Sequence, residues 1–282
     1  MKARLAILIF IGLLVITAAI ISICIYKRSI QNQYDEYIIK YSQMENEPAL
    51  KPVDAAIVKA IISARTNFTA RFVGENDEMG LCLIPKDGLE KFLDFHNTDD
   101  FIAVSADNKK EYGLACPNRI FPNHKNQPAV SPRGTRAFCP VCNSRMVQEL
   151  FDPEINIRIG TWYLAFLNAY IKENIDGLSD EDASTYSILV FGTGLETILA
   201  NIETQLRTTM KEKTGESTQD LPPEVVIRYL KQYLDAALEN KQLLDNIQSI
   251  KKRAEKYRPG LKKKAESMGI ELAPGNSGNT SK

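Results

Sequence analysis

The chain has 282 residues, of which 35 are basic and 35 acidic, so its formal net charge at pH 7 is zero. This balance lacks the overall positive charge that is typical of nucleic-acid binders, and we expect no nucleic-acid partner. Hydrophobic residues make up 44% of the sequence, which is enough for one well-buried core with accessory segments.

An almost continuously apolar segment, Leu5–Tyr26, contains no charged residue and no proline. As a helix it spans roughly 30 Å, which matches the hydrocarbon core of a bilayer. The small residues Thr17 to Ala19 raise the alternative of a cleaved signal peptide, but the apolar run continues past them, which is unlike a cleavage site. We therefore expect residues 1–28 to form a short cytoplasmic tip and an uncleaved, single-pass membrane anchor.

Further helix signals follow the anchor. Tyrosines and isoleucines at three- and four-residue spacing predict an amphipathic helix over Gln33–Glu47. Asp54 is placed to cap the next helix. Pro153 falls in the first turn of a helix that runs to about Lys172, where its missing N–H costs nothing.

Two more helices are predicted toward the C-terminus. Ser179, with Asp182 three residues later, is a variant of the capping box, and we expect Gly192 and Gly194 to end the helix that it starts. Pro222 and Pro223 open one long amphipathic helix whose apolar stripe continues to Ile247.

Five segments occur in a recognisable order. They are KAIISARTNF at Lys59–Phe68, MGLCLIP at Met79–Pro85, LFDPEINIRIGTWYL at Leu150–Leu164, YSILVFGTG at Tyr186–Gly194 and LPPEVVIRYLKQYLDAAL at Leu221–Leu238. In this order they resemble the motifs of soluble lytic transglycosylases and goose-type lysozymes. The resemblance implies a mainly α, lysozyme-like helical domain over residues 29–240, with the transmembrane helix before it and a cysteine-containing insert at about residues 90–148.

The chemistry of that family depends on one carboxyl group. It protonates the glycosidic oxygen between N-acetylmuramic acid and N-acetylglucosamine and then, as a carboxylate, assists attack by the sugar's own 6-hydroxyl. The position of the family's catalytic glutamate is Arg65 here, and a guanidinium has no usable base form. The resemblance therefore predicts that cleavage is lost or impaired. Glu78 is the candidate for a recruited carboxylate, and a solvated loop charge is its alternative interpretation.

The resemblance also implies a glycan-binding cleft. Its residues in this chain are Arg65, Asn67, Glu78, Gly80, Leu83, Tyr186 and Leu189. Leu83 stands where the family has a glutamine that contacts substrate, and Leu189 stands where it has a tyrosine. Tyr186 lies about one helical turn away and is a candidate to reach the cleft. Cys82 matches an apolar family position, and we expect it to be buried.

The insert carries four metal-ligand types, Cys116, His124, Cys139 and Cys142. Together they predict either a closed structural zinc site with three thiolates and one imidazole or, in an oxidising compartment, a disulfide. Spacing alone leaves both interpretations open, because only one complete CxxC pair is present.

The C-terminal part is basic over residues 241–272 and ends in a polar tail, residues 273–282, that we expect to be disordered. The basic stretch Lys251–Lys264 is either a solvated helix face or a surface that is attracted to anionic lipids or acidic wall polymers.

These features favour a membrane-anchored envelope protein with its body on the periplasmic or extracellular side. Its expected partners are peptidoglycan glycan strands, the membrane and other envelope proteins. The alternatives are an active lytic transglycosylase with a non-standard carboxylate and an envelope scaffold that binds other proteins.

Overall fold

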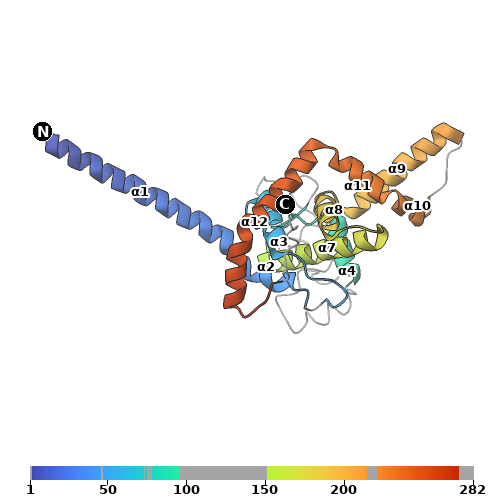
Figure 1. The fold of residues 1–282 in the computed structure, drawn as a ribbon, viewed down its shortest axis with the longest axis horizontal. Helices are drawn as coiled ribbons and strands as arrows, with labels where there is room; N and C mark the ends of the chain where they lie inside the picture. Colours follow the sequence, from blue (N-terminus) through green and yellow to red (C-terminus); the bar gives the residue numbers. More distant parts are fainter. Residues whose placement is uncertain are drawn as a thin grey trace, which may run out of the picture.

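The computed structural model describes residues 2–45, 47–72, 74, 78–95, 151–214 and 221–272. Over these ranges the chain is mainly helical (Figure 1), which confirms the predicted fold class at that level. Within the described residues, β pairing is confined to an isolated antiparallel bridge between Met79 and Ile84. The helices are α1 (Lys2–Asn32), α2 (Asp35–Ser42), α3 (Ala55–Thr66), α4 (Lys86–Phe95), α7 (Pro153–Asn174), α8 (Asp180–Thr193), α9 (Leu195–Thr214), α10 (Pro223–Arg228), α11 (Leu230–Leu238) and α12 (Lys241–Ser267).

The N-terminal helix α1 projects away from the helical body (Figure 1). Its large apolar side chains from Leu13 to Tyr26 are exposed, so no protein contact accounts for their hydrophobicity. By length and composition α1 qualifies as a membrane span. The pair α8 and α9 passes the same test if taken as one broken span, but the two helices meet at 90° and the apolar residues of α8 lie in the core.

The body is organised around two helices. α7 contributes fully buried residues along its length, among them Ile157, Trp162, Tyr163 and Leu167, and it packs against α2, α4 and α8. α3 is buried over almost all of its length and packs against α12. The basic C-terminal helix is therefore part of the body's core packing.

Three predicted helix starts are confirmed by their caps. The Asp54 carboxylate accepts a hydrogen bond from the Ala56 N–H at 2.8 Å, and Asp152 accepts one from Glu154 at 2.9 Å. The Ser179 hydroxyl accepts one from the Asp182 N–H at 3.1 Å. Each cap satisfies an amide that the first helical turn leaves without a partner.

Three sequence-based boundaries were wrong. The helix predicted over Gln33–Glu47 ends at Ser42, because Met44 adopts a positive φ of 54° outside the helical region. Gly192 lies inside α8, and the positive φ of 91° that ends this helix belongs to Gly194 alone. The single helix predicted after Pro222 is three helices: α10 and α11 divide at Tyr229, and Asn240 caps the start of α12 through the amides of Gln242 and Leu243.

The loop Met79–Ile84 lies between α3 and α7 and is buried. The side chain of Asn156, on α7, bridges it: the amide donates to the Met79 carbonyl at 2.9 Å and accepts from the Cys82 N–H at 2.8 Å. Thr66, at the end of α3, donates to the Leu81 carbonyl at 3.0 Å. Within the loop the Ile84 N–H donates to the Met79 carbonyl and the Leu83 N–H to the Gly80 carbonyl, both at 3.3 Å. Side chains satisfy other backbone groups of the loop.

Asn156→Ala removes both bonds and leaves the buried Cys82 N–H without this partner, whereas the Met79 carbonyl keeps its bond from the Ile84 N–H at 3.3 Å. We expect a loss of roughly 1–3 kcal/mol in unfolding free energy, since a buried unsatisfied group costs about that much. The measurement is denaturant unfolding of the full chain in detergent. The matched control is Asn168→Ala, a half-exposed position on the same helix, which we expect to cost little. Equal losses in the two variants would contradict the assigned role of Asn156.

Candidate functional site

Arg65 lies in the last turn of α3, which ends where Asn67 and Phe68 adopt positive φ values of 49° and 63°. Its guanidinium donates to the Leu83 carbonyl at 2.9 Å and to the Cys82 carbonyl at 3.3 Å. It also lies 3.4 Å from Oε1 of Glu78. Arg65 is thus a hydrogen-bond donor to the loop Met79–Ile84.

Glu78 is not a solvated loop charge, because it is only 7% exposed and faces the Arg65 guanidinium. Its side chain also packs closely over Gly74, where a β-carbon would collide with the carboxylate. The Gly74 N–H donates to the Glu78 carbonyl at 2.7 Å. The arrangement places Glu78 inside the loop, beside a cation, rather than at an open surface.

An aromatic ring from α8 completes the surroundings of Arg65. The guanidinium carbon lies 5.6 Å from the centroid of the Phe191 ring, which is buried. A cation at this distance from an aromatic face is attracted by the ring quadrupole. Sequence reasoning missed Phe191, because the comparison with the AYNAG motif directed attention to Leu189 and Val190. The signal that could have found it is its place one turn before the end of α8.

Burial governs the ionisation of the groups around Arg65. Loss of solvent lowers the pKa of the Arg65 guanidinium, while the Glu78 carboxylate opposes this shift. Because the pKa of a guanidinium lies far above neutral pH, Arg65 stays cationic all the same. Burial also raises the pKa of the Cys82 thiol to about 12, so this thiol stays protonated and behaves as the apolar residue predicted. Gly160 permits this packing, since a β-carbon there would lie 2.6 Å from the Cys82 sulfur.

The remaining predicted cleft residues divide into exposed and buried. Asn67 is exposed at the end of α3. Gly80, Leu83 and Leu189 are buried, the first two with positive φ values of 75° and 48°. Tyr186 is buried too, and its hydroxyl donates to Asp235 of α11; burial, assisted by Asp235, raises the pKa of this tyrosine. The structure therefore brings Arg65, Glu78 and Leu83 together and directs Tyr186 elsewhere.

The predicted zinc or disulfide residues, Cys116, His124, Cys139 and Cys142, lie outside the described residues. In the part of the chain that the structure describes, no cluster of three or more histidine, cysteine, aspartate or glutamate side chains could hold a metal ion. The choice between zinc and a disulfide stays a prediction.

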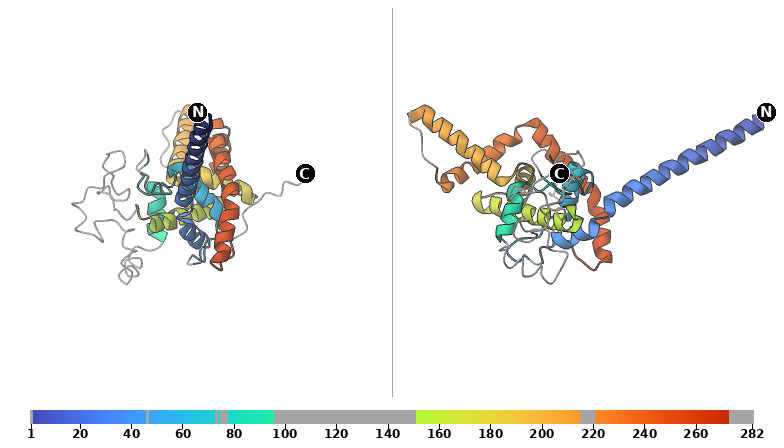
Figure 2. Two further views of the ribbon diagram at one scale, coloured as in Figure 1. Left: turned by 90° about the vertical axis from the view of Figure 1, so that its left-hand side faces the viewer. Right: turned by 180° about the vertical axis from the view of Figure 1, so that it is seen from behind.

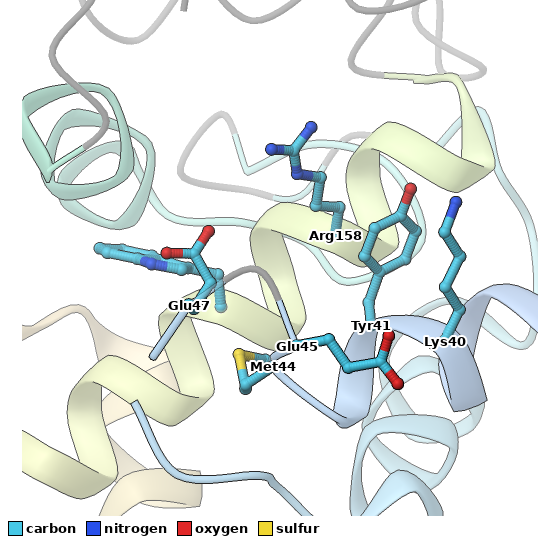
Figure 3. Close-up of a pocket in the computed structure, with 7 residues that line it drawn as sticks. Lys40, Tyr41, Met44, Glu45, Glu47 and Arg158 are labelled. Carbon is cyan, nitrogen blue, oxygen red and sulfur yellow. The ribbon is translucent and has the colours of Figure 1, made fainter. Parts of the chain in front are cut away.

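A small pocket lies where α2 meets α7 (Figure 3). It is lined by Lys40, Tyr41, Met44, Glu45, Glu47, Arg158 and Trp162. Its volume of about 60 Å³ has room for a few water molecules, not for a sugar ring. Lys40 and Tyr41 both bind the Glu154 carboxylate, at 3.1 and 2.8 Å, so this corner joins two helices.

A larger groove of about 710 Å³ runs between α3, α7, α8 and α12. Leu164, Ala165 and Ala169 supply apolar surface, while Asn168 and Ser184 supply groups that can hydrogen-bond. Its charged side chains are largely paired: Lys172 with Asp180, Lys251 with Glu181, and Arg258 with Asp54. An alternation of apolar surface and fixed polar groups suits a neutral, hydroxyl-rich ligand.

No family model, no curated protein and no solved structure matches this chain.

Arg65→Met removes the donor to the Leu83 and Cys82 carbonyls and the guanidinium beside Glu78. Breaking a buried ion pair costs roughly 3–5 kcal/mol, and we expect about 2–3 kcal/mol here because the Arg65 side chain is 17% exposed. Denaturant unfolding in detergent measures the effect, with the exposed Arg71→Met as the matched control. A variant as stable as the wild type would show that these contacts contribute nothing.

Proposed function

We propose that the chain is a membrane-anchored cell-envelope protein that binds peptidoglycan glycan strands through a lytic transglycosylase-like domain without cleaving them. Support for the fold comes from the order of the five motifs, and from the caps and helix starts at Asp54, Asp152 and Ser179. Support for the anchor comes from the exposed apolar surface of α1. On this proposal α1 crosses the cytoplasmic membrane and the body lies on the periplasmic or extracellular side.

The observation that carries the proposed loss of cleavage is the surroundings of Arg65. A glycoside-cleaving acid must present a proton to the glycosidic oxygen at hydrogen-bond distance. Arg65 instead uses its guanidinium on the Leu83 and Cys82 carbonyls, at 2.9 and 3.3 Å. Glu78, the recruited acid of the active-enzyme alternative, is buried against that guanidinium, which leaves a sugar oxygen little access to it.

We place the glycan strand in the groove between α3, α7, α8 and α12. Five of the seven cleft residues implied by the family are buried, so they offer a strand little contact surface. The groove, by contrast, is open, and its volume of about 710 Å³ lies within the range of small-molecule sites. Asn168 and Ser184 give the groove an uncharged amide and an uncharged hydroxyl. Both groups can hydrogen-bond to sugar hydroxyls and acetamido groups.

A second function is favoured by the burial of Leu83, Tyr186 and Leu189. These residues are packed in the core and do not line an open cleft, as expected of a fold kept as a scaffold. On this alternative the domain binds other envelope proteins, and the groove holds no glycan.

Co-sedimentation of the detergent-solubilised full chain with purified sacculi separates these functions. We expect the protein to sediment with sacculi and to release no 1,6-anhydro muropeptides above a control without protein. Asn168→Trp, which fills the groove, should lower the bound fraction several-fold, whereas Asn246→Trp on the exposed side of α12 should not. Arg65→Glu should stay inactive, because the polar groups absent at Leu83 and Leu189 are still missing.

Two other results would contradict the proposal. Anhydro products that disappear in Glu78→Gln would establish an active enzyme. A failure of the wild type to sediment, with its fold intact by circular dichroism, would leave the scaffold function.

A further inference from the structure

The end of α1 lies close to the boundary of its apolar run. That run ends at Tyr26, and α1 continues as an unbroken helix through Lys27 and Arg28 to Asn32. At about 1.5 Å per residue, Asn32 lies roughly 9 Å beyond Tyr26 along the helix axis. Whatever is fixed to Asn32 is therefore held near the surface of the membrane that α1 spans.

The body is fixed to this end of α1 by a buried lysine. Lys59 of α3 donates to the side-chain oxygen of Asn32 at 3.0 Å and to the Asp35 carboxylate at 2.5 Å. Both members of the Lys59–Asp35 pair are buried, and the ammonium lies 5.0 Å from the centroid of the Tyr257 ring of α12. Four helices, α1, α2, α3 and α12, thus meet at Lys59, which limits rotation of the body relative to α1.

α12 lies on the side of the body that faces α1. Lys264 of α12 pairs with Glu36 of α2 at 2.6 Å. Figure 1 shows the C-terminal part of α12 running across the end of α1, and the left view of Figure 2, from the side of α1, shows it beside that helix. The C-terminal half of α12 is therefore held beside the membrane-proximal end of the body.

The outer face of α12 is basic. Its inner face is buried through Ala254, Leu261 and Ala265. Lys256 and Lys263 lie at helical spacing on the opposite face and are exposed, and the exposed Lys252 lies at the edge of this face, where it also lines the groove. Within the described residues these three lysines form no ion pair. Three acidic residues lie nearby: Glu36 pairs with Lys264, Glu255 pairs with Arg258, and Glu266 is exposed.

We propose that this basic face, together with Lys27 and Arg28, lies against anionic phospholipid headgroups of the membrane that holds α1. The separation of roughly 9 Å along α1 is about one Debye length at physiological salt, so the attraction is felt at this range. A lysine near an anionic membrane surface contributes about 1 kcal/mol. The inference rests on the membrane anchor of the proposed function and is independent of glycan binding.

The test uses the full chain in nanodiscs of phosphatidylcholine, with or without phosphatidylglycerol. A fluorescent amino acid at the exposed position Ser267 reports energy transfer to headgroup-labelled lipid. We expect more transfer in the anionic discs, and we expect high salt to remove the difference. Lys256→Gln with Lys263→Gln should lower the ratio of docked to undocked chains by roughly 25-fold, since each lysine contributes about fivefold.

The matched control is Lys211→Gln with Lys213→Gln on α9, which changes the same charge at the far end of the body (Figure 1). We expect it to dock as the wild type does. Equal transfer in neutral and anionic discs, or no effect of the α12 variant, would overturn the inference. So would a response to a soluble acidic polymer but not to anionic lipid, which would assign the face to wall polymers. Chains that do not enter nanodiscs would instead disprove the membrane anchor. Chains that enter the discs but do not dock would overturn only this inference. Chains that enter the discs but do not bind sacculi would contradict the proposed glycan binding.

Discussion

The tight loop Met79–Ile84 imposes the constraint on which the packing of α3 and α7 depends. The loop is buried and includes positive φ values at Gly80 and Leu83, so its backbone cannot form an extended ladder. A buried carbonyl without a donor costs about 1–3 kcal/mol. This loop has several buried carbonyls that need donors. Side chains of Arg65, Thr66 and Asn156 supply the donors. The end of α3, the loop and the start of α7 are therefore one hydrogen-bonded unit.

On the proposed family relationship, this constraint explains how a catalytic position can become a structural one. An acid at position 65 would offer acceptors to a loop that presents carbonyl oxygens, whereas arginine offers up to five donors. The guanidinium reaches Leu83, Cys82 and Glu78 from one position and adds a contact with Phe191. On the proposed family relationship, the same substitution that removes the acid also strengthens the loop.

Local signals in the sequence predicted much of the fold. Asp54, Asp152 and Ser179 cap helices because a short polar side chain before a helix satisfies free amides whatever surrounds it. The exposed apolar helix α1 follows from its length and composition in the same way. The break at Asn240 was missed, because an apolar stripe continues across it and periodicity alone does not show a change of direction.

The candidate site was predicted only in part, because its contacts join residues far apart in the sequence. Arg65 and Glu78 were both singled out, but their pairing depends on how the loop folds back. Phe191 and Asp235 were missed, since which face of α8 meets α3 and which meets α11 is decided by packing. The groove has walls from four helices, and no single segment carries a pattern for it.

The central claim is that Arg65 has a structural role through Glu78 and the loop. A double-mutant cycle of Arg65→Met and Glu78→Gln, followed by denaturant unfolding of the full chain in detergent, tests it most directly. The account predicts that the two changes are coupled by roughly 1–3 kcal/mol, because Arg65 and Glu78 contact each other directly and each change removes the same contact. Effects that add to within about 0.3 kcal/mol would contradict it.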